Sequence, residues 1–286
     1  MANAYIAGFG YVGAALGAAL TVSGHTVWGL RRRAETRGDG VRILTGDLCA
    51  AGGPPLPDVP LDWVFYTASA DASTPEAYRR AYVDGPRSLL RALAAAGQSP
   101  RRVLFTSSTG VYHQQDGEWV DETSPTEPQT FSGQMLLEGE RVFLEGPFPA
   151  TVVRLAGIYG PGRTRLLDEV RSGRAVICPH ERRILNLVHR DDCAGALAFL
   201  AAQDAPTPVY CAVDDAPAPR AEVFSWLAAR AGVTLSVDAS PAETGAPVMH
   251  GGCRRVSNGR LRGAGYAFRF PTWRDGYGAL MTGSAQ

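Results

Sequence analysis

The sequence predicts an α/β fold in which a doubly wound parallel sheet is joined to a smaller C-terminal α/β lobe. Three observations lead to this prediction. Short apolar runs alternate with segments of helical periodicity, which is typical of parallel strands covered on both faces. A glycine-rich turn follows the first apolar run, and connections such as 99–102 and 145–149 are short.

The apolar runs are the predicted strands. They span 4–8, 26–30, 41–44, 63–68, 102–108, 151–157 and 208–213. The segments between them with helical periodicity span about 11–23, 75–96, 133–145, 163–172, 191–203 and 220–231. Because strands and helices take turns along the chain, we expect one parallel sheet with helices on both of its faces.

The alternation of strands and helices weakens after Pro161, except in the stretch 184–213. We therefore predict two parts. The sheet domain comprises 1–161 and 184–213, and a smaller lobe, expected to bind substrate, comprises 162–183 and 214–286.

A glycine motif between the first strand and the first helix has the spacing G-x-G-x-x-G at Gly8, Gly10 and Gly13. The first glycine permits a tight turn, the second lets the backbone approach a pyrophosphate, and the third lets helix and strand pack closely. This context indicates a Rossmann fold that binds a dinucleotide, although glycine-rich turns without a ligand also occur. The predicted phosphate contacts are Gly8, Phe9, Gly10, Tyr11, Val12 and Gly13.

The end of the second strand indicates which dinucleotide is bound. An NAD site usually carries an acid there to hold the ribose hydroxyls, but this chain has Leu30 followed by Arg31 and Arg32. Arginines can grip a 2′-phosphate in a bidentate fashion, whereas an acid would repel it. The sequence therefore favours NADP(H), the alternative being a solvated basic turn.

Further cofactor contacts are expected where the other strands end, because ligands of open α/β sheets bind at the carboxyl ends of strands. Asp47 can accept a hydrogen bond from an adenine amine, although a plain turn aspartate is an alternative. The remaining predicted contacts are Leu48, Thr67, Ala68, Ser69 and Thr106.

Composition narrows the classes of partner. The chain has 286 residues, is 45% apolar and carries no formal net charge. A neutral balance argues against nucleic acid or an anionic membrane as a partner, since both select basic surfaces. The five cysteines are dispersed, with no metal-ligand spacing, so we predict no metal site and a cytoplasmic location. All 28 basic side chains are arginine.

Several motifs occur in the order found in one superfamily. "FTSSTGVY" (105–112), "RLAGIYGPGR" (154–163) and "NLVHRDDCAGAL" (186–197) are similar to motifs of the extended short-chain dehydrogenase/reductases, which include nucleotide-sugar epimerases and dehydratases. "YVDG" (82–85) matches the N-V-x-G motif only in part. The tail 254–280 resembles the atypical YeeZ-like branch, whose members are typically described as NAD(P)-dependent epimerases.

The resemblance implies an active site that this chain only partly retains. Well-studied members use a serine or threonine after the fifth strand, a tyrosine that transfers a proton, and a lysine in Y-x-x-x-K spacing that lowers the tyrosine pKa. The serine corresponds to Ser108. Alignment on the glycine places Ser132 and Leu136 at the tyrosine and lysine positions, and alignment on the aromatic residue places Phe131 and Met135 there. No alignment can supply a lysine.

Other groups are therefore candidates for the missing chemistry. The catalytic candidates are Ser108, Thr109, Tyr112 and Tyr159, and the substrate-binding candidates are Ser132, Arg163 and His189. Each also has a structural interpretation, as a packed or backbone-bonded side chain. Asp191 is expected to cap the helix that follows it, and His189 to connect the lobes. Glu138 and Glu140 lie on the helix without the lysine, either solvated or facing the cofactor.

Three functions are compatible with the sequence. The first is an NADP(H)-dependent oxidoreductase or epimerase that acts on a small polar metabolite with Ser108 orienting its oxygen. The second is a non-redox isomerase or cyclase on the same scaffold. The third is a catalytically silent protein that senses NADP(H). The superfamily resemblance is also compatible with a homodimer formed through a pair of helices.

Overall fold

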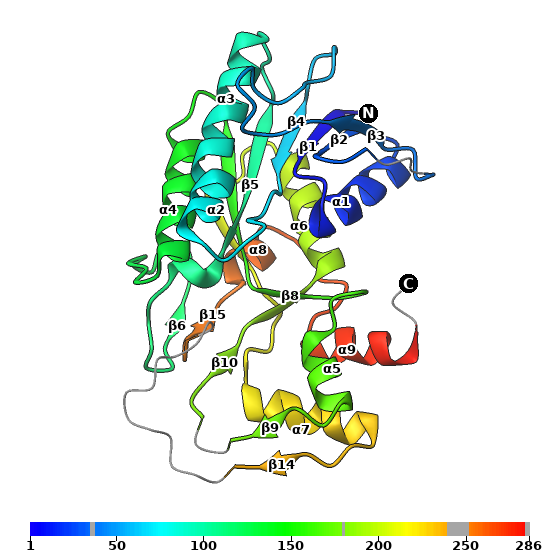
Figure 1. Cartoon of the computed structure of the whole chain (residues 1–286), viewed down its shortest axis with the longest axis vertical. Helices are drawn as coiled ribbons and strands as arrows, with labels where there is room; N and C mark the ends of the chain where they lie inside the picture. The colour runs from blue at the N-terminus through cyan, green and yellow to red at the C-terminus, as the bar shows by residue number, and fades with distance from the viewer. Residues whose placement is uncertain (35–37, 179–180, 239–251, 284–286) are drawn as a thin grey trace.

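The computed structural model describes residues 1–34, 38–178, 181–238 and 252–283, and a parallel seven-stranded sheet forms its centre (Figure 1). The strand order is β12-β7-β5-β4-β1-β2-β3. The strands are β1 (Asn3–Ala7), β2 (Thr26–Arg31), β3 (Arg42–Thr45), β4 (Trp63–Tyr66), β5 (Arg102–Ser108), β7 (Ala150–Leu155) and β12 (Val209–Ala212). From β1 the chain adds strands outward on one side, to β2 and β3, and it then crosses to β4 and adds strands outward on the other side. A crevice is therefore expected outside the carboxyl ends of β1 and β4, where this switch occurs.

Alternate residues of each strand point to opposite faces of the sheet, and both faces are buried. Ile6 and Phe65 pack with α1 (Tyr11–Val22) and α6 (Arg190–Ala202). Their neighbours Tyr5 and Val64 pack toward α3 (Gly85–Ala95) and α4 (Phe131–Leu144). Figure 1 shows α1 and α6 on one side of the sheet and α3 and α4 on the other. The doubly wound parallel fold predicted from the sequence is confirmed.

Two predicted elements are divided in the structure. The helix predicted over 75–96 consists of α2 (Pro75–Arg79), a π-helical turn at Arg80–Asp84, and α3. Pro86 has no N–H to donate to the Tyr82 carbonyl, which interrupts the α-helical pattern there. The strand predicted over 151–157 leaves the sheet after Leu155, because Gly157 opens the short strand β8 (Gly157–Tyr159), which pairs with β11 (Leu187–His189).

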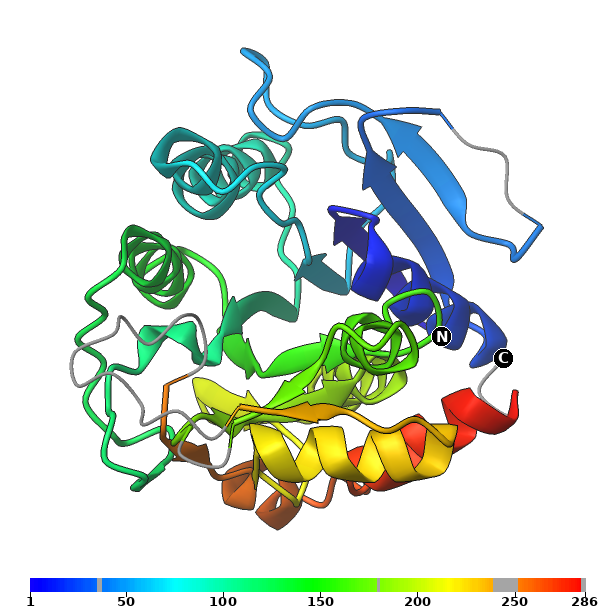
Figure 2. The same cartoon turned by 60° about the horizontal axis from the view of Figure 1, so that its bottom comes forward.

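A second hydrophobic core lies at one end of the sheet, formed by α5 (Arg165–Arg171), α7 (Arg220–Ala231) and α9 (Trp273–Thr282). Figures 1 and 2 show these helices gathered together with the short strands β9 (Val176–Ile177) and β14 (Ser236–Val237). Another small pair joins β10 (Ile184–Leu185) to β13 (Ala218–Pro219). Residues of this second core, which come from the C-terminal half of the chain, thus lie opposite the carboxyl ends of the sheet strands.

The tail returns from this second core to the main sheet. The strand β15 (Arg255–Val256) pairs with β6 (Trp119–Val120), and α8 (Gly259–Gly263) follows it. The Asn186 side chain fixes this return, since it donates to the Arg254 carbonyl and accepts from the Val256 amide. Residues just before β15 are thereby held next to the end of β5. Along the described residues, no helix has the length and apolar character needed to cross a bilayer.

Candidate active site

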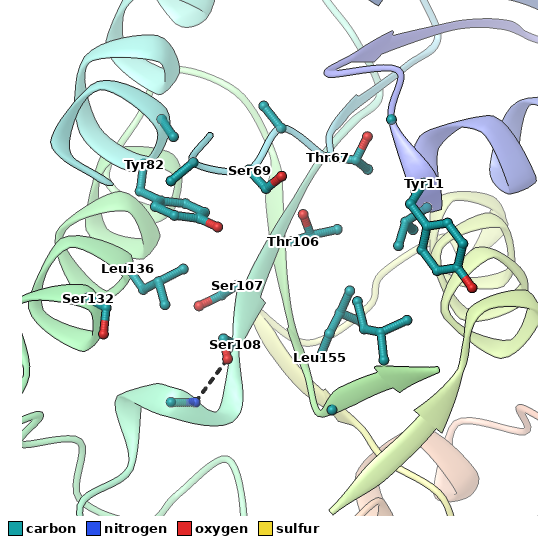
Figure 3. Close-up of a pocket in the computed structure, with 18 of the residues that line it drawn as sticks. Tyr11, Thr67, Ser69, Tyr82, Thr106, Ser107, Ser108, Ser132, Leu136 and Leu155 are labelled. Carbon is teal, nitrogen blue, oxygen red and sulfur yellow. Dashed lines mark hydrogen bonds between the residues drawn. The ribbon is translucent and has the colours of Figure 1, made fainter. Parts of the chain in front are cut away.

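A cavity of about 1640 Å³ lies at the carboxyl ends of the central strands, between the sheet and the second core. Figure 3 shows side chains from α1, the residues after β4, the end of β5 and the start of α4 around it. The site residues predicted from the sequence that line it are Gly8, Phe9, Gly10, Tyr11, Val12, Arg31, Arg32, Asp47, Leu48, Thr67, Ala68, Ser69, Thr106, Ser108, Thr109, Tyr112, Ser132, Tyr159 and Arg163. Gly13 and His189 lie behind its wall.

The glycine turn could not be built from other residues. Gly8 has φ +95°, and a Cβ on it would stand 2.3 Å from the Ala68 backbone nitrogen. A Cβ on Gly13 would stand 2.7 Å from the Thr67 Oγ1, and this hydroxyl donates to the Gly8 carbonyl at 2.8 Å. By contrast, a Cβ on Gly10 would meet only the Gly8 oxygen, at 3.9 Å. The turn thus packs tightly on its inner side and leaves room for a phosphate on its outer side.

The end of the cavity next to β2 and β3 is lined by charged groups. Arg31, Arg32 and Arg33 follow the buried Leu30. Arg32 pairs with Asp71 at 2.7 Å across this end. Asp47 accepts a hydrogen bond from the Cys49 amide and pairs with Arg80 at 2.6 Å, and these contacts hold the pKa of its carboxyl below the usual value. Sequence analysis did not identify Arg80, which arrives from the turn after α2.

Ser108 ends β5 and begins a short 3₁₀ turn at Thr109–Val111. Its Oγ accepts a hydrogen bond from the Gly110 amide at 3.0 Å, drawn dashed in Figure 3. The hydroxyl proton remains to be donated, and it faces the cavity together with Thr109. The sequence allows two interpretations of Ser108, as a ligand contact or as a hydroxyl bonded to the backbone. Both can hold together, since its oxygen accepts from the Gly110 amide while its O–H can still donate to a ligand.

The start of α4 distinguishes the two alignments considered above. Ser132 and Leu136 line the cavity (Figure 3). Phe131 and Met135 are absent from its wall, and Phe131 packs edge-on against Tyr78 outside it. The alignment on the glycine is therefore the one that matches the structure. A hydroxyl and an apolar side chain stand where the resemblance places a phenol and an ammonium group.

A buried polar network lies behind Ser107, on the sheet side of the cavity. Glu140 accepts two hydrogen bonds from Arg154, at 2.9 and 2.7 Å, and one from the Ser107 hydroxyl at 2.6 Å. Glu140 is only 2% exposed and does not line the cavity, so both interpretations of it, solvated or facing the cofactor, are wrong. It serves as the counter-ion of a buried arginine.

Tyr112 belongs to the same network. Its hydroxyl donates to the Asp121 carbonyl at 2.7 Å and accepts from Arg154 at 2.9 Å. An arginine does lie against this phenol, but burial raises the Tyr112 pKa above its usual value, and the charge of Arg154 is already neutralised by Glu140. With its proton committed to a backbone oxygen, Tyr112 is poorly placed as a proton donor.

Tyr159 and His189 are packed side chains. The Tyr159 ring stacks on Tyr277 with centroids 4.4 Å apart, its hydroxyl is enclosed, and burial raises its pKa. His189 is fully buried, and burial lowers its pKa to about 4. Its Nδ1 accepts the Asp191 amide at 3.2 Å, so His189 rather than Asp191 caps α6. The His189 ring also packs on Phe270 and edge-on against Tyr159 of the second core.

Arg163 occupies the loop after β8, in the exposed part of the cavity wall. Its guanidinium carbon lies 5.8 Å from the Tyr11 ring centroid, and the Tyr11 hydroxyl donates to the Pro161 carbonyl at 3.0 Å. These contacts hold the loop next to the glycine turn. Arg163 therefore faces both the predicted pyrophosphate position and the far half of the cavity.

Sequence analysis missed three kinds of lining residue. Tyr82, from the π-helical turn, points its hydroxyl into the cavity (Figure 3), and burial raises its pKa to about 12. Ser107 was overlooked beside Ser108. Arg183 comes from a segment without any motif signal. Arg254 opens the tail 254–280, whose resemblance gave it no site role, and it is 145 positions from its partner Thr109. Within the described ranges, no cluster of three His, Cys, Asp or Glu side chains could hold a metal ion.

Comparisons with known proteins agree with this architecture. The profile of the NAD dependent epimerase/dehydratase family matches residues 4–211. A structure from Methylobacillus flagellatus, provisionally described as an NAD-dependent epimerase/dehydratase, is 32% identical with a TM-score of 0.79, covering 100% of this chain and 99% of that one. The comparison with curated proteins gives no match.

Two further solved structures resemble the whole chain. A conserved protein of unknown function from Silicibacter pomeroyi is 27% identical with a TM-score of 0.80, and each chain is covered completely. The UDP-glucose 4-epimerase of Thermus thermophilus, solved in complex with NAD, is 19% identical with a TM-score of 0.74, covering 96% of both chains. At that identity the likeness concerns the fold alone.

Proposed function

Since the chain belongs to the NAD dependent epimerase/dehydratase family, we propose that it is an NADP(H)-dependent oxidoreductase or epimerase acting on a small polar metabolite. The observation that carries the proposal is the single cavity wall shared by the glycine turn, the arginines after β2 and Ser108. Such a wall offers a phosphate cradle at one end and a hydroxyl donor at the other.

The preference for NADP(H) rests on Leu30 and the residues after it. A buried leucine cannot accept hydrogen bonds from ribose hydroxyls, whereas Arg31 and Arg32 line the same end of the cavity. The glycine turn would hold the pyrophosphate, and Thr67, Ala68 and Ser69 follow β4 toward the middle of the cavity. A bound nicotinamide would supply the hydride acceptor or donor.

For the chemical step, we propose that the Ser108 hydroxyl donates a hydrogen bond to the substrate oxygen, keeps its proton, and thereby orients that oxygen. The usual phenol and ammonium pair is replaced by Ser132 and Leu136, so no cation stands ready to lower a phenol pKa at that position. Tyr82 points its phenol into the cavity, and its raised pKa of about 12 keeps it protonated at neutral pH as a hydrogen-bond donor.

The replacement at Ser132 and Leu136 also favours a second candidate function. A chain that keeps the cofactor cradle without the proton relay suits a silent protein that senses NADP(H), or a non-redox isomerase or cyclase. Binding without turnover on any substrate would identify the first of these alternatives, and turnover without a change in the redox state of the cofactor would identify the second.

Cofactor binding is tested by titrating the protein with NADPH and NADH and following fluorescence. Replacing Arg31 or Arg32 by alanine should weaken NADPH binding by about 10- to 100-fold, the value of one lost charge-assisted hydrogen bond. NADH binding should change by less than about threefold. Arg101→Ala, an exposed arginine outside the cavity, is the matched control. Equal weakening of both cofactors would sink the 2′-phosphate argument.

Catalysis is tested by NADPH oxidation across a panel of ketones, oxo acids and sugars. On any substrate that turns over, Ser108→Ala should lower kcat/KM by about 100-fold, since it removes a donor to the reacting oxygen. Thr45→Ala, at the exposed end of β3 outside the cavity, controls for a general effect of removing a hydroxyl. Unchanged turnover in the Ser108 variant would refute its role.

The remaining predictions from the sequence stand as proposals. The second core, whose helices flank the cavity, is proposed to select the substrate. The homodimer and the cytoplasmic location follow from analogy and from composition, and size-exclusion chromatography with light scattering would decide the first of these.

A further inference from the structure

Arg254 is a buried cation in the wall of the active-site cavity. It precedes β15 and is 6% exposed. Its Nη2 donates to the Thr109 carbonyl at 2.8 Å, and its Nε has no hydrogen-bond partner. In the part of the chain that the structure describes, no carboxylate forms an ion pair with it. Burial lowers its pKa, which reflects the same lack of compensation.

The local backbone is shaped to receive this guanidinium. Gly252 has φ +57°, and a Cβ there would stand 2.5 Å from the Arg254 Nη1. The Gly252 carbonyl accepts the Ile184 amide at 3.2 Å, which holds the segment beside β10. Any larger residue at position 252 would displace the arginine. The Arg254 backbone is held independently, since its carbonyl accepts a hydrogen bond from the Asn186 side chain.

A buried guanidinium without a counter-ion is unfavourable, because its charge has lost hydration and, unlike a carboxyl group, it cannot shed that charge by changing protonation state. Buried charges are normally paired or bind a ligand. Arg254 lines the cavity, and its guanidinium donates to the carbonyl of Thr109, the residue that follows Ser108. An anionic ligand at this place would supply the missing partner.

The charges around the cavity agree with this interpretation. At the end near β2 the lining arginines face two lining acids, Asp47 and Asp71. The lining arginines of the other half are Arg163, Arg165, Arg183 and Arg254, and no aspartate or glutamate of the described residues lines that half. Arg165 pairs with Glu169 from outside the lining, so the lining of this half is basic where the substrate, rather than the cofactor adenosine, would bind.

We propose that the substrate carries an oxyanion, a carboxylate or a phosphate, next to the carbon–oxygen group that Ser108 orients, and that Arg254 binds this oxyanion. The inference rests on the proposed function of the same cavity. A planar guanidinium with a free Nε suits an anionic oxygen, since it can donate along a fixed direction. The proposal names a substrate class that the glycine motif and Ser108 leave open.

The test measures binding by isothermal titration calorimetry, with and without saturating NADPH. The probes are oxalate for a carboxylate, inorganic phosphate for a phosphate, and UDP for a nucleotide diphosphate. Oxalate or phosphate should bind the wild-type protein with a dissociation constant on the order of 1 mM or lower. Arg254→Gln should weaken that binding at least tenfold, on the order of one charged hydrogen bond. Arg101→Gln, an exposed arginine outside the cavity, should leave it unchanged.

Two variants keep the test decisive. If Arg254→Gln does not fold, Arg183→Gln should weaken the same binding, because Arg183 lines the same half of the cavity. The proposal would be overturned if oxalate and phosphate bind equally well to the wild type and to both variants. It would also be overturned if the protein prefers UDP and UDP binding is unchanged in Arg254→Gln. Binding of an oxyanion that depends on Arg254 in a protein that fails to bind NADPH would support the oxyanion site and refute the proposed cofactor function.

Discussion

Arg154 and Arg254 are both buried beside the end of β5, but only one of them has a counter-ion. Arg154 pairs in register with Ser107 across β7 and β5, and it forms a bidentate bond to Glu140. Arg254 approaches from the tail, bonds the Thr109 carbonyl, and has no carboxylate partner among the described residues. The two guanidinium groups thus connect to the residues on either side of Ser108 in the sequence, Arg154 through Glu140, which accepts from Ser107, and Arg254 directly at the Thr109 carbonyl.

The difference indicates what each arginine is for. A buried charge with a complete set of partners is a structural unit, because breaking it leaves the other charge stranded. A buried charge that lacks a partner and faces a cavity is poised to bind a ligand. Asp214 is a third case. It is 2% exposed, without an ion pair in the described ranges, and burial raises its pKa to about 8, so it resolves the same problem by holding a proton.

The largest expected effect comes from breaking the compensated pair. Glu140→Gln would strand the Arg154 charge and should lower the free energy of unfolding by about 3–5 kcal/mol, measured by urea denaturation. Glu138→Gln, on the same helix, breaks the partly exposed pair with Arg87 and should cost less than about 1 kcal/mol. Equal losses in the two variants would mean that Glu140 compensates nothing.

An intermediate effect should appear in the pH dependence of stability. Between pH 3.8 and about 8 folded Asp214 holds a proton that the unfolded chain releases, so raising the pH favours unfolding. Between about pH 4 and 6.5 the unfolded chain instead binds a proton on His189 that the folded state excludes, so raising the pH favours folding. Below pH 6.5 the contributions of Asp214 and His189 to the pH dependence of the unfolding free energy oppose each other. Above pH 6.5 the loss of stability that Asp214 causes is no longer offset.

The free energy of unfolding should therefore fall by about 1.5 kcal/mol between pH 6.5 and 8, given about 1.4 kcal/mol per pH unit for one proton. Urea denaturation at three pH values across this range measures it. Asp214→Asn should remove the decline, and Asp204→Asn, at an exposed position, is the matched control that should keep it. A decline that persists in Asp214→Asn would assign the titration to another group.

The smallest expected effect is on the uncompensated arginine. Arg254→Gln should change the free energy of unfolding by no more than about 1 kcal/mol, because removing an unpaired buried charge offsets the loss of the hydrogen bond to the Thr109 carbonyl. Denaturation alongside Glu140→Gln gives a direct comparison. A loss as large as that of Glu140→Gln would place Arg254 with Arg154 as a structural residue.

Much of the fold could be predicted because its determinants are local. The alternation of apolar runs and helical segments defines the sheet, and Gly8 and Gly13 are required by contacts with Ala68 and Thr67 that any such turn must make. The splitting of helix 75–96 was not foreseen, although Pro86 was a visible signal. At the site, the spacing of α4 left two alternatives, Ser132 with Leu136 or Phe131 with Met135, and the cavity lining selects the first pair.

The sequence by itself determined the cradle, the place of Ser108 and the loss of the lysine, because each depends on residue identity at a fixed distance along one strand or helix. Only the tertiary structure decided that Glu140 serves Arg154, that Tyr112 gives its proton to the backbone, and that Arg254 reaches Thr109. Those contacts join residues from separate elements. Burial and partner choice at such positions depend on how the elements pack, which periodicity and spacing do not encode.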